Sequence, residues 1–519
     1  MKKLSKIFAV LSACALGAVA FSASACGGDS ESKLPLLQEN IVDDAYDNYY
    51  EIFVYSFNDS DGNGVGDLKG VTQKLDYVRD MGYTGIWLMP ICPSPSYHKY
   101  DVKDYKAIDP AYGTMADFEE LLSVAHSKGI KVITDLVVNH SSYDHPWFTE
   151  ARKAFRNGDT ENEYYDYYNF SHESQSGYSP AGGGVYYEAR FTSDMPDLNL
   201  DSEGVRAEIS SIIEFWMNKG VDGFRLDACT SYYTNNRAKS IEFAGWIKQE
   251  ATKHNPKAYI VGEADWSASA GEFYNSGADS FFWFPAQGSG GYVGSAIATA
   301  FNMGNAKSAV NSYYNSMNTV ISSAKGYVPA PFLCNHDTGR TAGFLVKNED
   351  RIKFAYGLLS LYSGNTFTYY GDEIGMTGSS NDPDKRVGMR WTATTAGIYP
   401  PGVTSRDDST FYNFPSVEEQ LKDKDSILNY YKLCNNARNA FPALMRGTAE
   451  RLEQSNEEVL VVKKTYGDQS VIVVVNFSKE TNVIEGDYGE LKQGLCVEGS
   501  VKSSGSKHTM PGMSIAIFA

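Results

Sequence analysis

Cysteine, positive charge and long apolar runs are all scarce in this chain of 519 residues. Seven cysteines show no metal-type pair spacing, and a chain of this size needs no disulfide framework, so at most one or two bridges are expected. The net charge of −18 would repel nucleic acid and anionic membrane surfaces, which argues against both as partners. With 42% hydrophobic residues, the chain can still bury a core in roughly two or three folding units. A neutral ligand fits this balance best.

The one long apolar run, Ile7–Phe21, stands at the N-terminus between three lysines and the small residues that precede Cys26. This pattern is typical of an export signal, and the run is too short for a stable spanning helix. Ala-Ser-Ala-Cys resembles a bacterial lipobox, which predicts a signal peptide over residues 1–25, lipidation of Cys26 and a tether over residues 26–45. We therefore expect an extracellular lipoprotein that contacts the membrane only through its lipid anchor. Ordinary cleavage after Ala-x-Ala is the alternative.

Short β-rich runs alternate with helical stretches from about Tyr49 onward, which favours parallel βα units. Eight such units predict an α/β fold, a (β/α)8 TIM barrel over residues 46–140 and 200–438. The expected strands are Ile52–Phe57, Gly85–Met89, Lys131–Val137, Gly223–Asp227, Tyr259–Glu263, Ser280–Phe284, Pro331–Asn335 and Thr366–Gly371.

Helices are expected between the strands, for example over Val71–Asp80 and Met115–Ser127. The second has clear ends, because Thr114 and Asp117 form a capping-box pattern and Gly129 is a typical C-terminal stop.

Two regions depart from the βα alternation. Residues 141–199, after the third strand, show no clear helix but a tyrosine-rich stretch over 163–170, and we interpret them as an inserted subdomain. Residues 439–519 become all-β, with a hairpin formed by Val459–Lys464 and Val471–Phe477, which predicts a C-terminal β-sandwich domain.

Polar runs end four of the expected strands, and each would place a carboxylate or an imidazole at the mouth of the barrel. They are Asp135-Leu-Val-Val-Asn-His140, Gly223-Phe-Arg-Leu-Asp227, Val261-Gly-Glu263 and Cys334-Asn-His-Asp337. In order and spacing these runs resemble the four signature regions of the α-amylase family, glycoside hydrolase family 13. Met195-Pro-Asp-Leu-Asn199 and Tyr370-Gly-Asp-Glu-Ile-Gly375 extend the resemblance, which covers nearly the whole chain beyond the signal peptide.

The resemblance implies a retaining glycosidase in which Asp227 is the nucleophile and Glu263 the acid/base. In such enzymes one carboxylate attacks the anomeric carbon while a protonated one donates to the departing oxygen, and the two lie about 5–5.5 Å apart. Asp337 matches the third acid, which binds sugar hydroxyls and stabilises the transition state. Nearby anions should raise the pKa of Glu263, and Arg225 lies on the strand face of Asp227, where it can hold the nucleophile ionised.

The same resemblance implies glucan contacts by His98, Tyr100, Asp101, His140 and His336, and position along the chain adds Arg225 and Trp266 to this set. The two imidazoles His140 and His336 would bind the sugar at the cleavage position, and Tyr100 would stack on it. Trp266 is either a platform for the leaving sugar or a packed residue at the barrel rim.

Two segments differ from the common family pattern. Ala228-Cys-Thr-Ser231 lacks the Lys-His pair of many amylases, and Arg386–Trp391 replaces a commoner Pro-Met-Gln-Trp segment. Leaving-side contacts and substrate range therefore cannot be transferred from relatives.

A calcium loop is expected after the first strand. Asp59, Asp61, Asn63 and Asp67 supply side-chain oxygens and Val65 a carbonyl, in an order suited to Ca²⁺ although not to an EF-hand. A solvated acidic turn is the alternative.

The sequence as a whole thus predicts a monomeric, endo-acting α-amylase that cleaves α-1,4 bonds of starch and maltodextrins. The alternatives are an exo-acting α-glucosidase, an oligo-1,6-glucosidase or neopullulanase-like enzyme, and, in another class, a non-catalytic glucan-binding lipoprotein. The three acids argue against the last.

Overall fold

A barrel of parallel strands lies at the centre of the computed structural model, which describes residues 37–264, 267–378, 381–395 and 397–519. Its strands are β1 (Asn48–Ile52), β2 (Gly85–Leu88), β3 (Lys131–Leu136), β7 (Gly223–Leu226), β8 (Tyr259–Gly262), β9 (Ser280–Trp283), β10 (Val328–Pro331) and β11 (Thr366–Tyr369). They pair in the order β10-β9-β8-β7-β3-β2-β1-β11, and a parallel bridge from Phe332 to Phe367 closes the ring. The predicted (β/α)8 barrel is confirmed.

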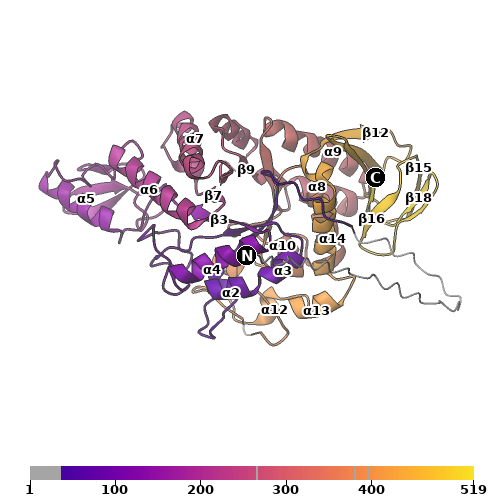
Figure 1. The fold of residues 1–519 in the computed structure, drawn as a ribbon, viewed down its shortest axis with the longest axis horizontal. Helices are drawn as coiled ribbons and strands as arrows, with labels where there is room; N and C mark the ends of the chain where they lie inside the picture. Colours follow the sequence, from indigo (N-terminus) through magenta and orange to yellow (C-terminus); the bar gives the residue numbers. More distant parts are fainter. Residues whose placement is uncertain (1–36, 265–266, 379–380, 396) are drawn as a thin grey trace, which may run out of the picture. The chain divides into compact units, whose positions relative to one another are not determined.

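Helices return the chain from one strand to the next and surround the barrel (Figure 1). They are α1 (Val54–Phe57), α2 (Leu68–Gln73), α3 (Leu75–Asp80), α4 (Met115–Ser127), α6 (Glu203–Lys219), α7 (Arg237–His254), α8 (Tyr292–Ile297), α9 (Ala306–Ser323), α10 (Thr341–Phe344) and α11 (Glu349–Ser360). After β11 follow α12 (Asp408–Phe411), α13 (Val417–Lys422), α14 (Ile427–Ala440) and α15 (Pro442–Arg446).

The alternation of side chains along each strand decides what fills the barrel, because every second residue points inward. Tyr49, Ile133 and Val261 belong to one buried cluster of aromatic and aliphatic side chains inside the ring. Two residues further along the same strands stand Glu51, Asp135 and Glu263. The polar layer at the mouth of the barrel is therefore the next inward-facing layer above the apolar core.

Two strands begin earlier than the sequence predicts. The predicted strand Ile52–Phe57 is wrong, since β1 ends at Ile52 and a helical turn follows. The predicted strand Pro331–Asn335 is also wrong, because β10 ends at Pro331. The polar residues Asn48 and Glu51 made β1 difficult to predict. A buried carboxylate is stable only with a partner, and here the partner lies elsewhere in the chain. Two prolines in β10 obscured that strand.

The helix predictions had mixed outcomes. The bounds of α4 and its capping box of Thr114 and Asp117 are confirmed. The single helix predicted over Val71–Asp80 is wrong, because the chain breaks at Lys74 into α2 and α3.

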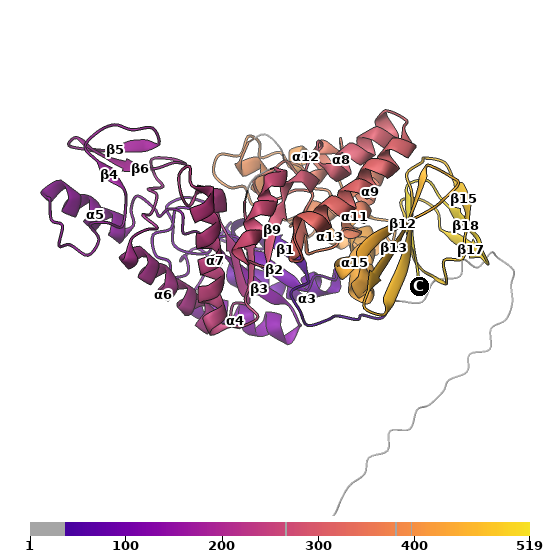
Figure 2. The same ribbon diagram turned by 90° about the horizontal axis from the view of Figure 1, so that it is seen from above.

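The insertion after β3 contains α5 (Pro146–Asn157) and a small antiparallel sheet of β4 (Phe170–Ser171), β5 (Tyr178–Gly182) and β6 (Val185–Glu188). The expectation of no clear helix here is wrong. Pro146 starts α5 at a position where its missing N–H costs nothing, and Gly158 ends it in the left-handed region with φ of 66°. Within residues 37–519, this insertion and the C-terminal sheets lie on opposite sides of the barrel (Figures 1 and 2).

The C-terminal region folds as two antiparallel sheets. One has the order β12-β13-β14-β19-β16 and the other β15-β18-β17. The strands are β12 (Thr448–Leu452), β13 (Val459–Tyr466), β14 (Gln469–Asn476), β15 (Asn482–Glu485), β16 (Leu491–Cys496), β17 (Lys502–Ser504), β18 (Lys507–Met510) and β19 (Ser514–Phe518). Side chains of both sheets, such as Val474 and Ile484, share one apolar cluster, as in a sandwich. The predicted hairpin is β13 and β14.

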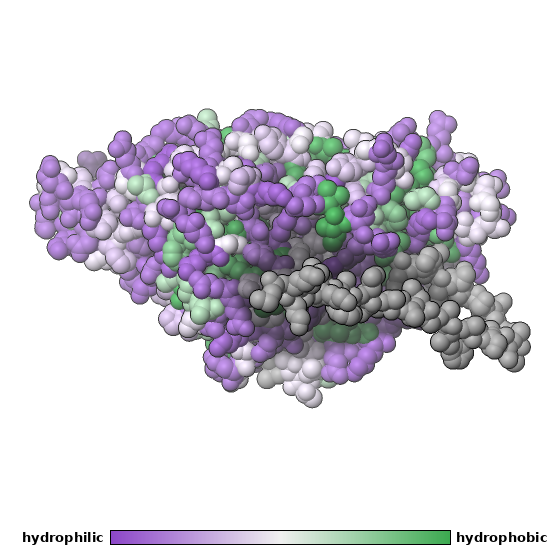
Figure 3. Space-filling model, viewed as in Figure 1, coloured by the Kyte–Doolittle hydropathy of each residue, from purple (hydrophilic) through white to green (hydrophobic). Residues whose placement is uncertain are grey.

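Hydrophilic residues dominate the face drawn in Figure 3, where hydrophobic residues form small, separate patches. Within the described residues, no helix combines the length and the apolar character needed to cross a membrane. Cys26 lies outside the described residues. The five cysteines that the structure describes are free thiols.

Candidate active site

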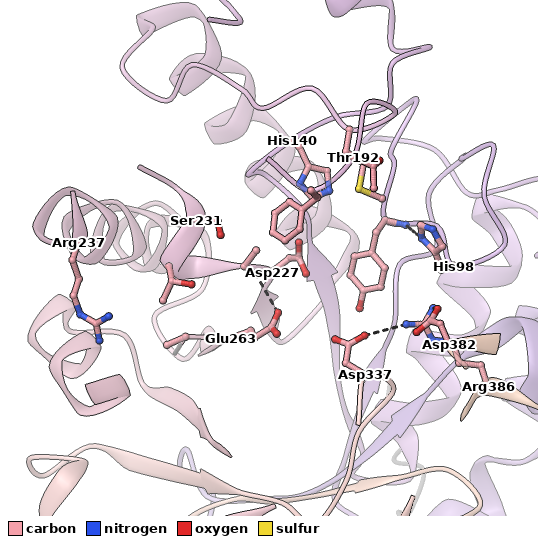
Figure 4. Close-up of a pocket in the computed structure, with 16 residues that line it drawn as sticks. His98, His140, Thr192, Asp227, Ser231, Arg237, Glu263, Asp337, Asp382 and Arg386 are labelled. Carbon is pink, nitrogen blue, oxygen red and sulfur yellow. Dashed lines mark hydrogen bonds and ion pairs between the residues drawn. The ribbon is translucent and has the colours of Figure 1, made fainter. Parts of the chain in front are cut away.

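A pocket of about 820 Å³ opens at the C-terminal ends of the barrel strands. Figure 4 shows Asp227, Glu263 and Asp337 around it, with His98 and His140 nearby. The complete lining is His98, Tyr100, His140, Phe191, Thr192, Met195, Asp227, Ala228, Thr230, Ser231, Arg237, Glu263, Ala264, Asp337, Asp382 and Arg386. Three acids from three different strand ends thus meet at one cavity, as the four strand-end motifs predicted.

Arg225 connects the carboxylates beneath this pocket. Its Nη1 lies 2.6 Å from Asp135 Oδ1 and 2.7 Å from Asp227 Oδ1, and its Nη2 lies 2.6 Å from Glu263 Oε2. Only 1% of the guanidinium-bearing side chain is exposed. Charge-assisted hydrogen bonds of this kind fix both the position and the charge of a carboxylate. Arg225 therefore orients two of the acids with a single rigid group.

Glu263 is the acid whose protonation is most altered. Burial raises the pKa of its carboxyl group to about 7, since the neighbouring anions Asp227 and Asp337 act in the same direction and together outweigh the cation Arg225. A carboxylic acid that keeps its proton near neutral pH can serve as a general acid.

Asp337 is held in the opposite state. Burial alone would raise the pKa of its carboxyl group, but His336 and Arg386 more than offset this and hold it well below the usual range. Its Oδ2 lies 3.1 Å from His336 Nε2 and its Oδ1 accepts from Arg386 Nη2 at 3.1 Å. Asp337 is therefore an anion across the pocket from Glu263, which keeps its proton below about pH 7.

His336 is itself held by a second carboxylate, since its Nδ1 lies 2.6 Å from Glu51 Oε1. Burial alone would lower the pKa of the imidazole, but Asp337 and Glu51 overcome this and raise it to about 9. An imidazolium with both N–H groups paired to carboxylates is fixed in orientation.

Asp135 completes the polar layer. Its Oδ2 accepts from Trp87 Nε1 at 3.1 Å and from Tyr100 Oη at 3.2 Å, and its side chain is fully buried. Tyr100 in turn lies 2.9 Å from His336 Nε2, and the two rings stack with centroids 5.6 Å apart. The hydroxyl group of Tyr100 is thus held by Asp135 and His336, and one face of its ring by the His336 ring.

Only some of the residues expected to contact the sugar line the pocket. His98, Tyr100 and His140 line the pocket, and His140 Nε2 is buried without a hydrogen-bond partner among the described residues, so it is available to a ligand. The carboxylate of Asp101 instead accepts from Ser94 Oγ at 2.6 Å, outside the pocket lining. Trp266 lies outside the described residues.

The insertion supplies one wall of the pocket through Phe191, Thr192 and Met195. Phe191 is 48% exposed and its ring meets that of His140 edge to face, with centroids 5.3 Å apart. The tyrosines over 163–170, expected as platforms, do not line the pocket, and Tyr167 and Tyr168 are buried. Sequence reasoning therefore missed Phe191, which no motif marks.

Further residues of the site were also missed by sequence reasoning. Arg386 binds Asp382 through Nη1 at 2.8 Å as well as Asp337, and Tyr97 Oη donates to Asp382 at 2.6 Å. Arg386 stands in a segment already noted as departing from the family pattern, which was a usable signal. Glu51 could have been found from the alternation along β1, because it follows Tyr49 on the inward face.

The predicted calcium loop brings the carboxylates of Asp59, Asp61 and Asp67 within 4.8 Å of one another. Asp59 accepts backbone N–H groups from Gly62 and Gly64, both at 2.7 Å, and these bonds lower the pKa of its carboxyl group against the effect of burial. Three anionic groups this close repel one another unless a cation lies among them, and oxygen donors are the ligands that Ca²⁺ prefers. The donor set fits the ion.

Comparison with known proteins gives a consistent result. The family description "Alpha amylase, catalytic domain" matches residues 51–447. "Alpha-amylase 3" of Dictyoglomus thermophilum is 38% identical over 84% of this chain and 85% of its own length. An oligo-1,6-glucosidase of Parageobacillus thermoglucosidasius is 28% identical over 84% of this chain and 90% of its own. The solved structure of Eubacterium rectale Amy13B superposes with a TM-score of 0.86 at 37% identity, over 93% of this chain and 96% of that one.

Proposed function

Because the chain belongs to the α-amylase family of glycoside hydrolases, family 13, we propose that it is a retaining, endo-acting α-amylase that hydrolyses α-1,4 bonds of starch and maltodextrins. The observation that carries this proposal is the layer in which Arg225 binds both Asp227 and Glu263 while Asp337 faces them across the pocket. Two carboxyl groups on one guanidinium favour the short separation of retaining enzymes over the wider gap that admits a water.

In the first step, Glu263 donates its proton to the glycosidic oxygen as the bond from that oxygen to the anomeric carbon breaks. Asp227 attacks this carbon and forms a covalent glycosyl ester. In the second step, the Glu263 carboxylate takes a proton from water while the water oxygen attacks the same carbon and releases Asp227. Asp337 binds hydroxyls of the distorted sugar, and Arg225 orients Asp227 through a charge-assisted hydrogen bond.

Interior cutting needs sugar subsites on both sides of the acids. On the leaving side the pocket continues along Phe191, Thr230 and Ser231, where the exposed ring of Phe191 can pack against a glucose face. A relative that is 38% identical bears the name α-amylase, which supports the same choice.

The test follows iodine staining and reducing ends during digestion of amylose. Early loss of stain with few new ends supports interior cutting. Glucose that accumulates while the stain persists would instead show an exo-acting enzyme.

A specific observation favours the exo-acting alternative, an α-glucosidase or oligo-1,6-glucosidase. Arg386, Asp382 and Tyr97 form a bonded group beside Asp337, on the side opposite Glu263 where the non-reducing end must lie. Maltoheptaoside blocked at its non-reducing end separates the two, since only an endo-acting enzyme can cut it. Pullulan measured in parallel reports tolerance of α-1,6 bonds.

We also propose that the loop of Asp59, Asp61, Asn63, Val65 and Asp67 binds a structural Ca²⁺ ion. Support comes from the close approach of its three carboxylates. The ion would neutralise these acids and tie the loop together away from the pocket, and the residues of the pocket carry out the hydrolysis.

For the location, we propose a monomer that is tethered outside the cell through a lipid on Cys26. The sequence pattern before Cys26 supports the anchor. On the face drawn in Figure 3, the small size of the hydrophobic patches supports the monomer.

A further inference from the structure

A buried ion pair includes a residue of the loop that carries two pocket residues. Lys99 Nζ is 2.7 Å from Asp109 Oδ2, and the two side chains are only 9% and 8% exposed. Lys99 stands between His98 and Tyr100, both of which line the pocket. Neither member of the pair takes part in the proposed hydrolysis.

The backbone at Lys99 is strained. Its φ of 68° lies in the left-handed region, which a side chain with a Cβ rarely adopts and where glycine is the usual residue. Such a conformation persists only when surrounding contacts hold it. The ion pair is one such contact, and the Lys99 N–H, which donates to Ser96 Oγ at 3.2 Å, is another.

Asp109 ties several parts of the loop together. Its Oδ2 also accepts from the backbone N–H of Ser94 at 3.3 Å, and its Oδ1 accepts from the backbone N–H of Ala111 at 2.9 Å. The carboxylate therefore fixes the start of the loop and, through Lys99, its middle. A left-handed residue reverses the local course of the backbone, so the side chains on its two sides depend on that residue for their directions.

From this arrangement we propose that Lys99 is a positioning residue for glucan binding, which holds Tyr100 and His98 against the glycone sugar through its pair with Asp109. The inference rests on the proposed function and adds a determinant of substrate affinity to it. Loss of the anchor should let the loop relax to ordinary φ values and move the Tyr100 ring off the sugar. Displacements of about 1 Å at a binding group can cost roughly 100-fold in rate.

The test compares Lys99→Met, which keeps the length but removes the charge, with Lys99→Arg, which restores a cation. Kinetics are measured with 4-nitrophenyl α-maltotrioside. We expect kcat/KM of Lys99→Met to fall roughly 10- to 100-fold, mainly through a higher KM, because Tyr100 packs on the sugar before and during reaction. Lys99→Arg should recover most of the loss.

Lys248→Met is the matched control. Lys248 Nζ lies 2.6 Å from Asp279 Oδ2 and donates to the Ala258 carbonyl at 2.6 Å, just before two barrel strands begin and so at the end of the barrel opposite the pocket. Its KM should equal that of the wild type. A purely structural role for Lys99 would reduce the fraction of folded enzyme, which lowers apparent kcat and leaves KM unchanged; that result in Lys99→Met would overturn the proposal.

If Lys99→Met does not fold, Asp109→Asn is measured in the same way, since its amide oxygen still accepts from Ala111 while an NH2 group replaces the oxygen that binds Lys99 and Ser94. A KM equal to that of the wild type in this variant would also overturn the proposal. A wild-type protein that releases no product would contradict the proposed function instead.

Discussion

Glu51 and His336 form a buried pair inside the barrel, with Glu51 Oε1 2.6 Å from His336 Nδ1, although 285 residues separate them in the sequence. The pair joins the first barrel strand to the loop after β10, which carries Asp337. Because His336 binds Asp337 with its other nitrogen, the position of the third acid depends on a carboxylate that touches no substrate.

This pair should make stability depend on pH. The pKa of His336 is raised to about 9 in the folded protein, against about 6.5 when unfolded. A raised pKa gives a contribution that is complete below about pH 6.5 and is lost as the pH rises through about 9. We expect the free energy of unfolding to decline across this window, and less steeply in Glu51→Gln. Urea unfolding at several pH values measures both slopes, and equal slopes would contradict the prediction.

Removal of the nucleophile should abolish turnover and spare binding. Asp227→Asn preserves shape but cannot form the glycosyl ester, so we expect a loss on the order of 10⁴-fold in kcat. Migration in gels that contain amylopectin should stay slowed, as in the wild type. A mutant that keeps more than about a tenth of the activity, a change in barrier under about 1.4 kcal/mol, would refute the assignment of Asp227.

Activity should fall on the alkaline side of neutrality. The first step needs protonated Glu263, whose pKa is raised to about 7, so kcat/KM should drop about tenfold per pH unit above that value. Glu263→Gln should show no such decline with α-maltosyl fluoride, a substrate whose leaving group needs no proton. Persistence of the alkaline decline in this variant would assign it to another residue.

Calcium should stabilise the folded chain. An ion that binds only the folded state at a hundredfold excess over its dissociation constant contributes about 2.7 kcal/mol. Chelation with EGTA should therefore lower the melting temperature of the wild type. Asp61→Ala removes an exposed carboxylate that accepts a hydrogen bond from the Asn63 N–H and keeps the backbone bond of residue 61 to Asp59, and it should melt at the same temperature with and without EGTA. No shift in the wild type and no bound calcium would mean that the loop is a turn only.

Lipidation should depend on one cysteine. Labelling of cells with a palmitate analogue should tag the wild type and miss Cys26→Ser, because the thiol of Cys26 is the expected point of attachment. Equal labelling of both proteins would rule out the lipobox interpretation, and release of the unlabelled wild type into the medium would favour ordinary signal cleavage.

Local signals predicted much of this molecule. The ends of α4 followed from Thr114, Asp117 and Gly129, whose effects act within a few residues. The strand-end motifs likewise located Asp227, Glu263 and Asp337 in one pocket. Each of these patterns involves residues that are close together in the sequence, so it can be recognised before the fold is known.

The parts that could not be predicted depend on distant partners. Glu51 is unfavourable in a buried strand without its partner His336, which lies far away in the sequence, and Arg386 is held in position by Asp337 and Asp382. Phe191 lies in the pocket because the insertion folds back over the barrel mouth, which no spacing within 141–199 reveals.

The wall formed by Phe191, Thr192 and Met195 comes from the insertion, whereas the three acids stand at the ends of barrel strands. Mutations in this wall can therefore alter which sugar is accepted without disturbing the groups that break the bond. In a chain built in this way, exchange of one loop region during evolution can change the substrate range. The reaction itself stays the same, because its groups belong to the barrel.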